Sequence, residues 1–145
     1  MEKNIQETAL RSLARREHSA RELTQKLKSK GFTTTDIDPL LENLRQTNLI
    51  NDNRFTENYI YWRRQRGYGP LRIAMELQIR GISADIIAEH LQITDNAWSV
   101  GAQQVWRKRF KTNPLNNMKE KAKQQRFLQQ RGFTREHINS IFEST

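Results

Sequence analysis

The chain has no cysteine among its 145 residues, and it has no long apolar run. The absence of cysteine excludes a disulfide framework, a thiolate metal site and a cysteine nucleophile. No stretch approaches the roughly 18 consecutive apolar residues that a membrane-spanning helix needs. The first residues, MEKNIQETALRS, are charged and lack the apolar segment of a signal peptide. We therefore expect a soluble protein of the cytoplasm with no membrane partner.

Apolar side chains are also scarce. They make up 35% of the chain, below the usual level of about 45–50%. The length is that of about one domain, yet this apolar content is lean for a single thick core. It is nevertheless too high and too periodic for a disordered chain. The composition favours a thin array of helices, elongated and curved.

Acidic side chains are scarce in the last third of the chain. Residues 1–50 hold nine basic and seven acidic side chains (net +2), and residues 51–100 hold six of each (net 0). Residues 101–145 hold ten basic and three acidic side chains (net +7). A basic surface concentrated in one region is typical of proteins that bind a polyanion or an acidic protein surface.

A repeat runs through the sequence. Three stretches align: KLKSKGFTTTDIDPLL, ELQIRGISADIIAEHL and FLQQRGFTREHINSIF. Each has a leucine, a base, a glycine, an apolar residue and a hydroxyl at matched positions. The glycines Gly31, Gly81 and Gly132 are separated by 50 and 51 residues. This self-similarity predicts three units of residues 1–50, 51–94 and 95–145.

The shared segment predicts a helix, a stop and a second helix. Glycine suits the residue that follows a helix, because it enters the left-handed region without a steric penalty. Ser19 and Glu22 are predicted to form a capping box, and Asp52 is the predicted N-cap of the helix that contains Phe55 and Tyr59. Pro70 and Pro114 are predicted first residues of helices. The pattern predicts nine helices in three triplets, an all-α fold.

Motifs for catalysis are missing. His18, His90 and His137 fall in different units and lack metal-ligand spacing, so we interpret them as structural. The segment Gly67–Pro70 lacks the lysine and hydroxyl that complete a phosphate-binding loop. A nuclease with a magnesium ion on Asp52 remains an alternative, but a helix cap is the favoured role of this residue. We expect no enzyme activity, no cofactor and no metal.

Basic residues gather in two clusters. Four arginines surround Tyr68 in the first cluster, an arrangement that can grip phosphates and stack on a base or a side chain. The alternative for Tyr68 is packing against a neighbouring helix, and for the second cluster it is a solvated helix face. Trp106 and Phe110 are predicted to be core residues. The predicted binding residues are Arg63, Arg64, Arg66, Tyr68, Arg72, Arg107, Lys108, Lys111, Lys123, Arg126 and Arg131.

The sequence resembles the RecX family of regulatory proteins. The resemblance rests on ALRSLARREHSARELTQKL (9–27), LINDNRFTENYI (49–60), RRQRGYGPLRIAMELQIRGIS (63–83) and QQRFLQQRGFTREHI (124–138). GYGPLRI with the following EL and RGIS is its most specific part. Arg63, Arg66, Tyr68 and Arg72 occupy family-typical positions. One departure is Asn51-Asp52, where family members often carry an acidic pair.

The resemblance implies tandem three-helix repeats and a cytoplasmic modulator of the RecA recombinase, generally an inhibitor. Such a protein lies in the groove of the RecA–DNA filament and reduces strand exchange, ATP turnover and coprotease activity, and thereby regulates DNA repair, recombination and the SOS response. We expect a monomer that binds single- and double-stranded DNA weakly and without sequence preference. The alternative is a stand-alone DNA-binding protein of the helix-turn-helix type, since each triplet resembles that motif.

Overall fold

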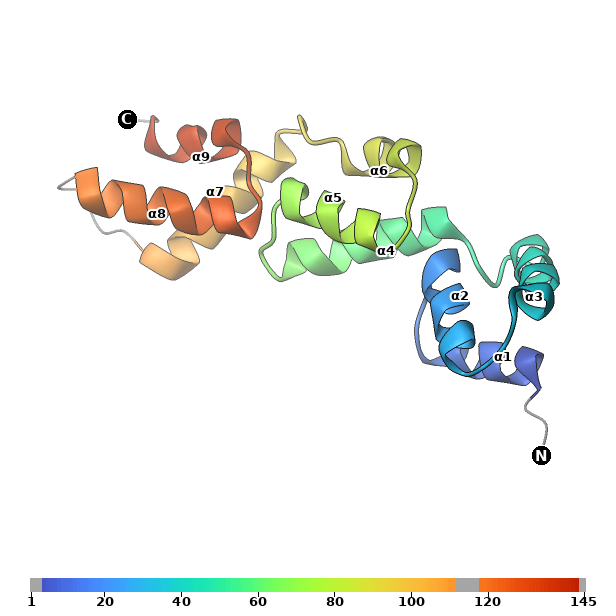
Figure 1. Cartoon of the computed structure of the whole chain (residues 1–145). Coiled ribbons are helices and arrows are strands. Elements are labelled where there is room, and N and C mark those ends of the chain that lie inside the picture. The colour runs from blue at the N-terminus through green and yellow to red at the C-terminus, as the bar shows by residue number, and fades with distance from the viewer. Residues whose placement is uncertain (1–3, 112–117, 144–145) are drawn as a thin grey trace. The chain divides into compact units, whose positions relative to one another are not determined.

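The structure, a computed structural model, is helical and describes residues 4–111 and 118–143 (Figure 1). No strand occurs among these residues, so the all-α prediction is confirmed for them. The helices fall into three triplets along the chain. Their bounds are α1 (Ile5–Arg15), α2 (Ala20–Ser29), α3 (Thr34–Gln46), α4 (Asp52–Gln65), α5 (Pro70–Ile79), α6 (Ala84–Leu91), α7 (Ala97–Phe110), α8 (Met118–Arg131) and α9 (Arg135–Phe142). Pro114, a predicted helix start, lies outside the described residues.

The second helix of every triplet ends in the same turn. Gly31, Gly81 and Gly132 have φ angles of +99°, +82° and +102°, so the predicted left-handed conformation is confirmed. The amide that follows each glycine donates to the carbonyl of the leucine five residues earlier, for example Phe32 to Leu27 at 3.1 Å. This bond is the mark of the Schellman motif, which satisfies carbonyls at a helix end. The shared Leu-x-x-base-Gly pattern therefore encodes a common helix end.

The helix starts follow the predicted caps with one exception. Ser19 and Glu22 form the expected capping box at α2, and α5 begins at Pro70. The prediction that Asp52 caps its own helix is wrong. Asn51 takes that place and accepts from the amide of Arg54 at 2.9 Å. Asp52 is the first residue of α4, and its carboxylate accepts from the amide of Ala20 at 3.0 Å, the first amide of α2.

The described residues form two compact units. Residues 4–58 and Leu77–His90 make the first unit, and Tyr59–Glu76 with residues 91–143 make the second. In the first unit α1, α2 and α3 pack on one another around fully buried Leu23, Leu27 and Ile37. In the second unit α7 packs against α8 and α9. Helices α4 and α5 each supply residues to both units.

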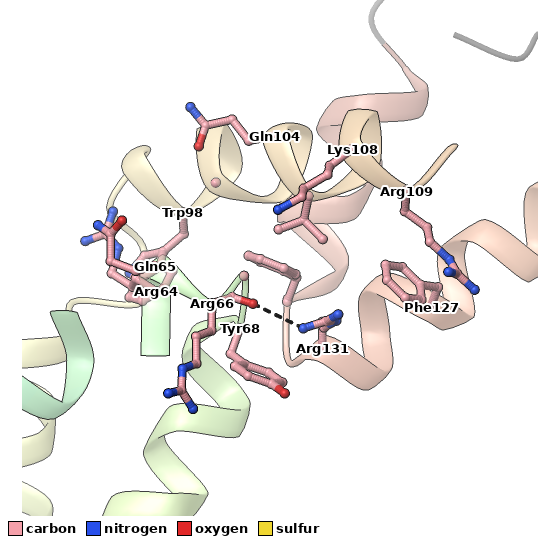
Figure 2. Close-up of a pocket in the computed structure, with 14 residues that line it drawn as sticks. Arg64, Gln65, Arg66, Tyr68, Trp98, Gln104, Lys108, Arg109, Phe127 and Arg131 are labelled. Atoms are coloured by element: carbon pink, nitrogen blue, oxygen red, sulfur yellow. Dashed lines mark hydrogen bonds between the residues drawn. The ribbon is translucent and has the colours of Figure 1, made fainter. Parts of the chain in front are cut away.

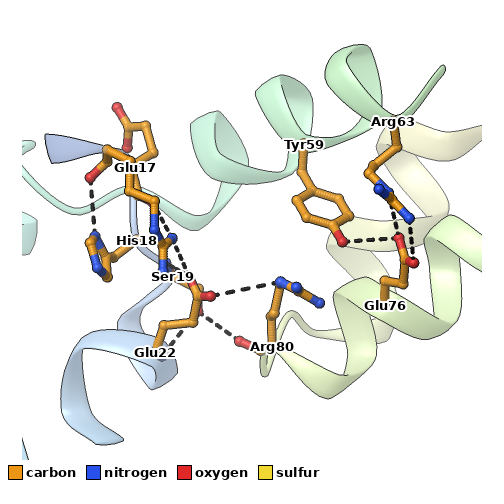
Figure 3. A network of polar contacts seen from close by, with 9 residues as sticks. Glu17, His18, Ser19, Glu22, Tyr59, Arg63, Glu76 and Arg80 are labelled. Atoms are coloured by element: carbon orange, nitrogen blue, oxygen red, sulfur yellow. Dashed lines mark hydrogen bonds and ion pairs between the residues drawn. The ribbon is translucent and has the colours of Figure 1, made fainter. Parts of the chain in front are cut away.

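The first unit joins the first triplet to the Arg-Gly turn at the end of α5. The hydroxyl of Ser19, wholly buried, donates to the carbonyl of Arg80 at 2.7 Å while it accepts from the amide of Glu22 (Figure 3). The guanidinium of Arg80 lies 3.7 Å from the carboxylate of Glu22. The side chain of Arg21 lies directly against Gly81. The first turn of α2 therefore covers the helix end that the next triplet presents.

The second unit repeats this contact one triplet later. The amide of Gly69 donates to the carbonyl of Arg131 at 2.8 Å, and the amide of Leu71 donates to that of Gly132 at 2.9 Å. Arg72 packs against Gly132 as Arg21 packs against Gly81. We call this recurring contact, between the first turn of one triplet's second helix and the next triplet's Arg-Gly turn, the seam. One seam lies in each unit.

The seam predicts that three equivalent glycines differ in their tolerance of alanine. At Gly81 a Cβ would lie 2.5 Å from the Cβ of Arg21, and at Gly132 it would lie 2.6 Å from the backbone nitrogen of Arg72. At Gly31 no described atom lies within 4 Å. Gly31→Ala should cost about 1–2 kcal/mol through its left-handed backbone, and Gly81→Ala and Gly132→Ala should add about 1–3 kcal/mol of overpacking. Urea unfolding of the three variants measures this difference, and equal losses would contradict the seam.

Candidate functional site

Tyr68, on the turn between α4 and α5, is packed among arginines. The guanidinium carbon of Arg63 lies 3.9 Å from the centre of its ring, that of Arg72 lies 4.4 Å away and that of Arg131 lies 4.9 Å away. A guanidinium over an aromatic face is attracted by the ring's negative charge distribution. The structure shows Tyr68 packed within the protein, and its contact with a phosphate or a base stays a prediction. The ring orders the surrounding cations.

Two of these arginines bind one carboxylate, which offsets one of their two positive charges. Arg63 donates to both oxygens of Glu76, at 2.9 and 2.8 Å, and Arg72 donates to one of them at 3.3 Å (Figure 3). The hydroxyl of Tyr59 donates to the same carboxylate at 2.9 Å. Glu76 therefore relieves part of the repulsion between Arg63 and Arg72. The relieving residue, Glu76, was missed, although its spacing of four from Arg72 on one helix is a recognisable signal.

The hydrogen bonds outweigh burial at Glu76. Burial alone raises the pKa of this carboxyl, but the bonds from Arg63, Tyr59 and Arg72 more than reverse this effect and leave the pKa below its ordinary value. Burial likewise lowers the pKa of Arg63, and the bonds to Glu76 overcome it and raise that pKa. Both groups are therefore charged near neutral pH. Together with Tyr68 they form a fixed frame at the end of α4.

A pocket of about 500 Å³ opens beside this frame (Figure 2). Its walls are the end of α4 with the following turn, α7, and the end of α8 with its turn. Both aromatic and basic side chains line it, and no lining residue among those described is acidic. The bases are Arg64, Arg66, Lys108, Arg109 and Arg131. Because all walls belong to the second unit, the pocket is built within that unit alone.

Three of the pocket's four guanidinium groups are held by uncharged partners. Arg131 donates to the carbonyl of Arg66 at 3.2 Å and lies 5.3 Å from the ring centre of Phe127. Arg109 lies 5.3 Å from the same ring, and Arg64 lies 4.4 Å from that of Trp98. Among the described residues, none of these bases forms an ion pair with a carboxylate. Their positive charge is thus ordered but not neutralised.

The predicted binding residues separate into three groups. Arg64, Arg66, Tyr68, Lys108 and Arg131 line the pocket. Arg63 and Arg72 lie against Tyr68 and bind Glu76. The remaining four are exposed and do not line the pocket: Arg107, Lys111, Lys123 and Arg126.

The basic and aromatic residues Arg109, Trp98 and Phe127 also line the pocket and were not among the predicted binding residues. Arg109 lies at the end of α7 and lines the pocket, and the sequence marks it only as one of several bases between residues 107 and 111. Trp98 and Phe127 carry no sequence signal for a pocket. Trp106 and Phe110 are half-buried and pack on Phe142 and Phe127, in accord with their predicted core role.

The histidines hold local structure. Burial lowers the pKa of His18, whose Nδ1 lies 3.0 Å from the carbonyl of Arg16. His90 bonds to Asn53 at 2.9 Å, and His137 bonds to the carbonyl of Ile93 at 3.1 Å. Within the part of the chain that the structure describes, no three metal-ligating side chains come together. No described helix has the length and apolar character to cross a bilayer.

The Glu76 network predicts a pH-dependent loss of stability in Glu76→Gln. Near neutral pH the free energy of unfolding of the variant should be lower than that of the parent by about 2 kcal/mol, since hydrogen bonds to charged groups contribute roughly 1.5–3 kcal/mol. The hydrogen bonds to Glu76 hold its native pKa below the ordinary value of a glutamate. The ionised carboxylate therefore contributes fully to the free energy of unfolding when the pH is above the pKa of Glu76 in the unfolded chain. This contribution disappears as the pH falls through the lower native pKa, where the two proteins should have the same stability. Urea unfolding from pH 7 to pH 3 measures this.

Glu57→Gln is the matched control, because Glu57 is an exposed residue of α4. Its difference from the parent protein should be small at every pH. A Glu76→Gln difference that stays constant down to pH 3 would contradict the assigned role of the carboxylate.

Comparison with known proteins identifies the family. Residues 7–44, 51–91 and 101–142 match the models of the first, second and third three-helix domains of RecX. The regulatory protein RecX of Legionella pneumophila (strain Corby) is 44% identical over 137 residues, which cover 94% of this chain and 91% of that protein. The regulatory protein RecX of Halorhodospira halophila is 39% identical over 136 residues, 94% and 84% of the two chains.

Solved structures share the fold. The crystal structure of RecX from Lactobacillus salivarius aligns with a TM-score of 0.82 at 21% identity, over 96% of this chain and 92% of that one. A second, the crystal structure of regulatory protein RecX, aligns with a TM-score of 0.82 at 22% identity, over 97% and 74%. The matched domains, the relatives and the shared architecture of three-helix repeats lead to one conclusion: the chain belongs to the RecX family of regulatory proteins.

Proposed function

We propose that this protein binds the RecA–DNA filament and lowers the ATP turnover, strand exchange and coprotease activity of RecA. The proposal is supported by family membership, since the relatives are named regulatory proteins. It is also supported by the family-typical Arg63, Arg66, Tyr68 and Arg72, three of which belong to one ordered cluster around the tyrosine ring. The protein acts in this proposal as a ligand of the filament and catalyses no reaction of its own.

The observation that carries the proposal is the basic surface of α7 and α8. Residues 101–145 have a net charge of +7, and the exposed bases of these helices are not engaged by carboxylates among the described residues. A filament of recombinase on DNA offers phosphates and acidic side chains together. Exposed Arg107, Lys111, Lys123 and Arg126 would contact them without reading base sequence.

An apolar face of α5 supports a protein partner in addition to DNA. Leu71 and Met75 lie four residues apart and are 48% and 57% exposed. Residues at that spacing lie on one face of a helix. Exposed apolar faces are typical of protein contacts and contribute little to phosphate binding. A recombinase surface that pairs acidic and apolar groups would use both features.

Regulation follows from unequal affinity. A ligand shifts an assembly only as far as it binds one state more tightly than another. If the protein prefers a filament geometry that does not support ATP turnover or extension, substoichiometric amounts bound at growing ends alter the whole filament. This mechanism requires a surface of suitable shape and charge, and it requires no catalytic residue.

Addition of the protein to RecA on single-stranded DNA tests the proposal. Substoichiometric amounts should lower the rate of ATP hydrolysis, and the double variant Lys123→Glu, Arg126→Glu should lose most of this effect. Arg11→Glu, Lys28→Glu makes the same charge change at exposed positions of the first unit and should retain it. An unchanged hydrolysis rate over a range of salt concentrations would reject the proposal. Tight, sequence-selective binding to free duplex DNA would favour a stand-alone DNA-binding protein instead.

The basic surface also predicts a steep salt dependence. If about five bases meet phosphates, a plot of log affinity for duplex DNA against log salt concentration should slope near −4 to −5, because each neutralised phosphate releases condensed counterions. Fluorescence anisotropy of a labelled duplex at several salt concentrations measures the slope. The Lys123→Glu, Arg126→Glu variant should show a slope shallower by about 2, and an unchanged slope would exclude these two residues from the contact.

A further inference from the structure

The pocket of the second unit differs from the rest of the basic surface in its shape. Filament binding through exposed helix faces requires no cavity, yet an open pocket of about 500 Å³ is lined by α7, the end of α8 and the turn after α4. That volume falls in the range of roughly 300–1,000 Å³ typical of small-molecule sites. Figure 2 shows Arg66, Lys108 and Arg131 around this space. The size of the pocket is therefore suited to a small-molecule ligand.

The charge of the pocket selects an anion with many charges in a small volume. Five bases line it, and no lining carboxylate among the described residues offsets them. One isolated phosphate would leave most of this charge unbalanced. A nucleic acid strand spreads its phosphates at about one charge per 3.4 Å of helix axis, so a strand brings few of them into a pocket. A chain of directly linked phosphates places several charges there at once.

The arginines are ordered for such a ligand. Arg131 is held by the carbonyl of Arg66 and by the Phe127 ring. Arg109 lies 5.3 Å from the centre of the same ring. A guanidinium already held in one orientation loses less conformational entropy when it binds, and its planar fork matches two phosphate oxygens. Lys108, which no carboxylate engages among the described residues, adds a mobile point charge. We infer that this pocket binds a small molecule with a chain of linked phosphates, a nucleoside triphosphate or inorganic polyphosphate.

The aromatic residues indicate that the phosphates, and not a nucleobase, dominate the affinity. Trp98 and Phe133 are each only 2% exposed, so neither offers a face for stacking. The ring of Tyr68 is already engaged by three guanidinium groups, and that of Phe127 by two. A nucleobase would therefore add little, and tripolyphosphate should bind within a few-fold of ATP. Adenosine, which has the base and sugar but no phosphate, should not bind measurably.

Calorimetry on the isolated full-length protein tests this inference. ATP, inorganic tripolyphosphate and adenosine are titrated without recombinase, DNA or divalent metal, so the result does not depend on the proposed function. Both phosphate compounds should bind to one site. The double variant Lys108→Gln, Arg109→Gln should weaken them at least tenfold, because it removes two charged hydrogen-bond donors from the pocket.

Lys119→Gln, Arg135→Gln is the matched control. It removes one lysine and one arginine from exposed positions of the same unit that do not line the pocket, so the net charge falls by the same amount. This control should change the affinity less than twofold. Equal weakening in the two double variants would mean attraction by net charge alone, and it would overturn the inference.

A measurement on the parent protein avoids any dependence on the folding of variants. Amide shifts in the NMR spectrum on addition of tripolyphosphate should concentrate at residues 64–68 and 98–109. Shifts spread evenly over the exposed bases of α8 would overturn the inference. The absence of binding by either phosphate compound would also overturn it, and weaker single-stranded DNA binding by Lys108→Gln, Arg109→Gln would then assign the pocket to a nucleic acid strand.

Discussion

The architecture depends on one contact, the seam between the Arg-Gly turn of one triplet and the first turn of the preceding triplet's second helix. Each three-helix repeat buries few apolar side chains, and its helix end presents backbone carbonyls that need partners. Ser19 and the amides of Gly69 and Leu71 supply these partners. The approach is close enough that no side chain fits at Gly81 or Gly132. Each compact unit consequently contains one seam, and the residues of the second repeat are divided between the two units.

The second unit contains two groups of basic residues, one that binds a carboxylate and one, in the pocket, that binds none among the described residues. Around Tyr68 the positive charge is partly offset, since Glu76 binds Arg63 and Arg72. A few residues away, Arg131 and Arg64 are held by a carbonyl and an aromatic ring. The group that binds Glu76 stabilises the turn and orders Tyr68, and the pocket group retains its attraction for anions. Arg131 links the two groups, because it contacts Tyr68 and lines the pocket.

Much of the fold could be predicted from the sequence because its signals are local. The left-handed glycines, the capping box at Ser19 and the start of α5 at Pro70 each depend on residues within one turn of helix. The prediction failed at Asp52, whose carboxylate bonds to a distant amide, that of Ala20. Local patterns do not reveal such a partner. The candidate site was predicted in the same way: the basic residues were found, but not their division between the pocket, the Glu76 network and the exposed faces.

The sequence by itself determined the helices, their threefold repetition, the basic last third and the family, because each follows from the order and spacing of neighbouring residues. Only the tertiary structure decided which charges are neutralised and where a cavity forms. Glu76 neutralises Arg63 across the turn between α4 and α5, and the pocket needs walls from residues 64–68, α7 and α8. These properties depend on distances between side chains far apart in the chain, and packing sets those distances.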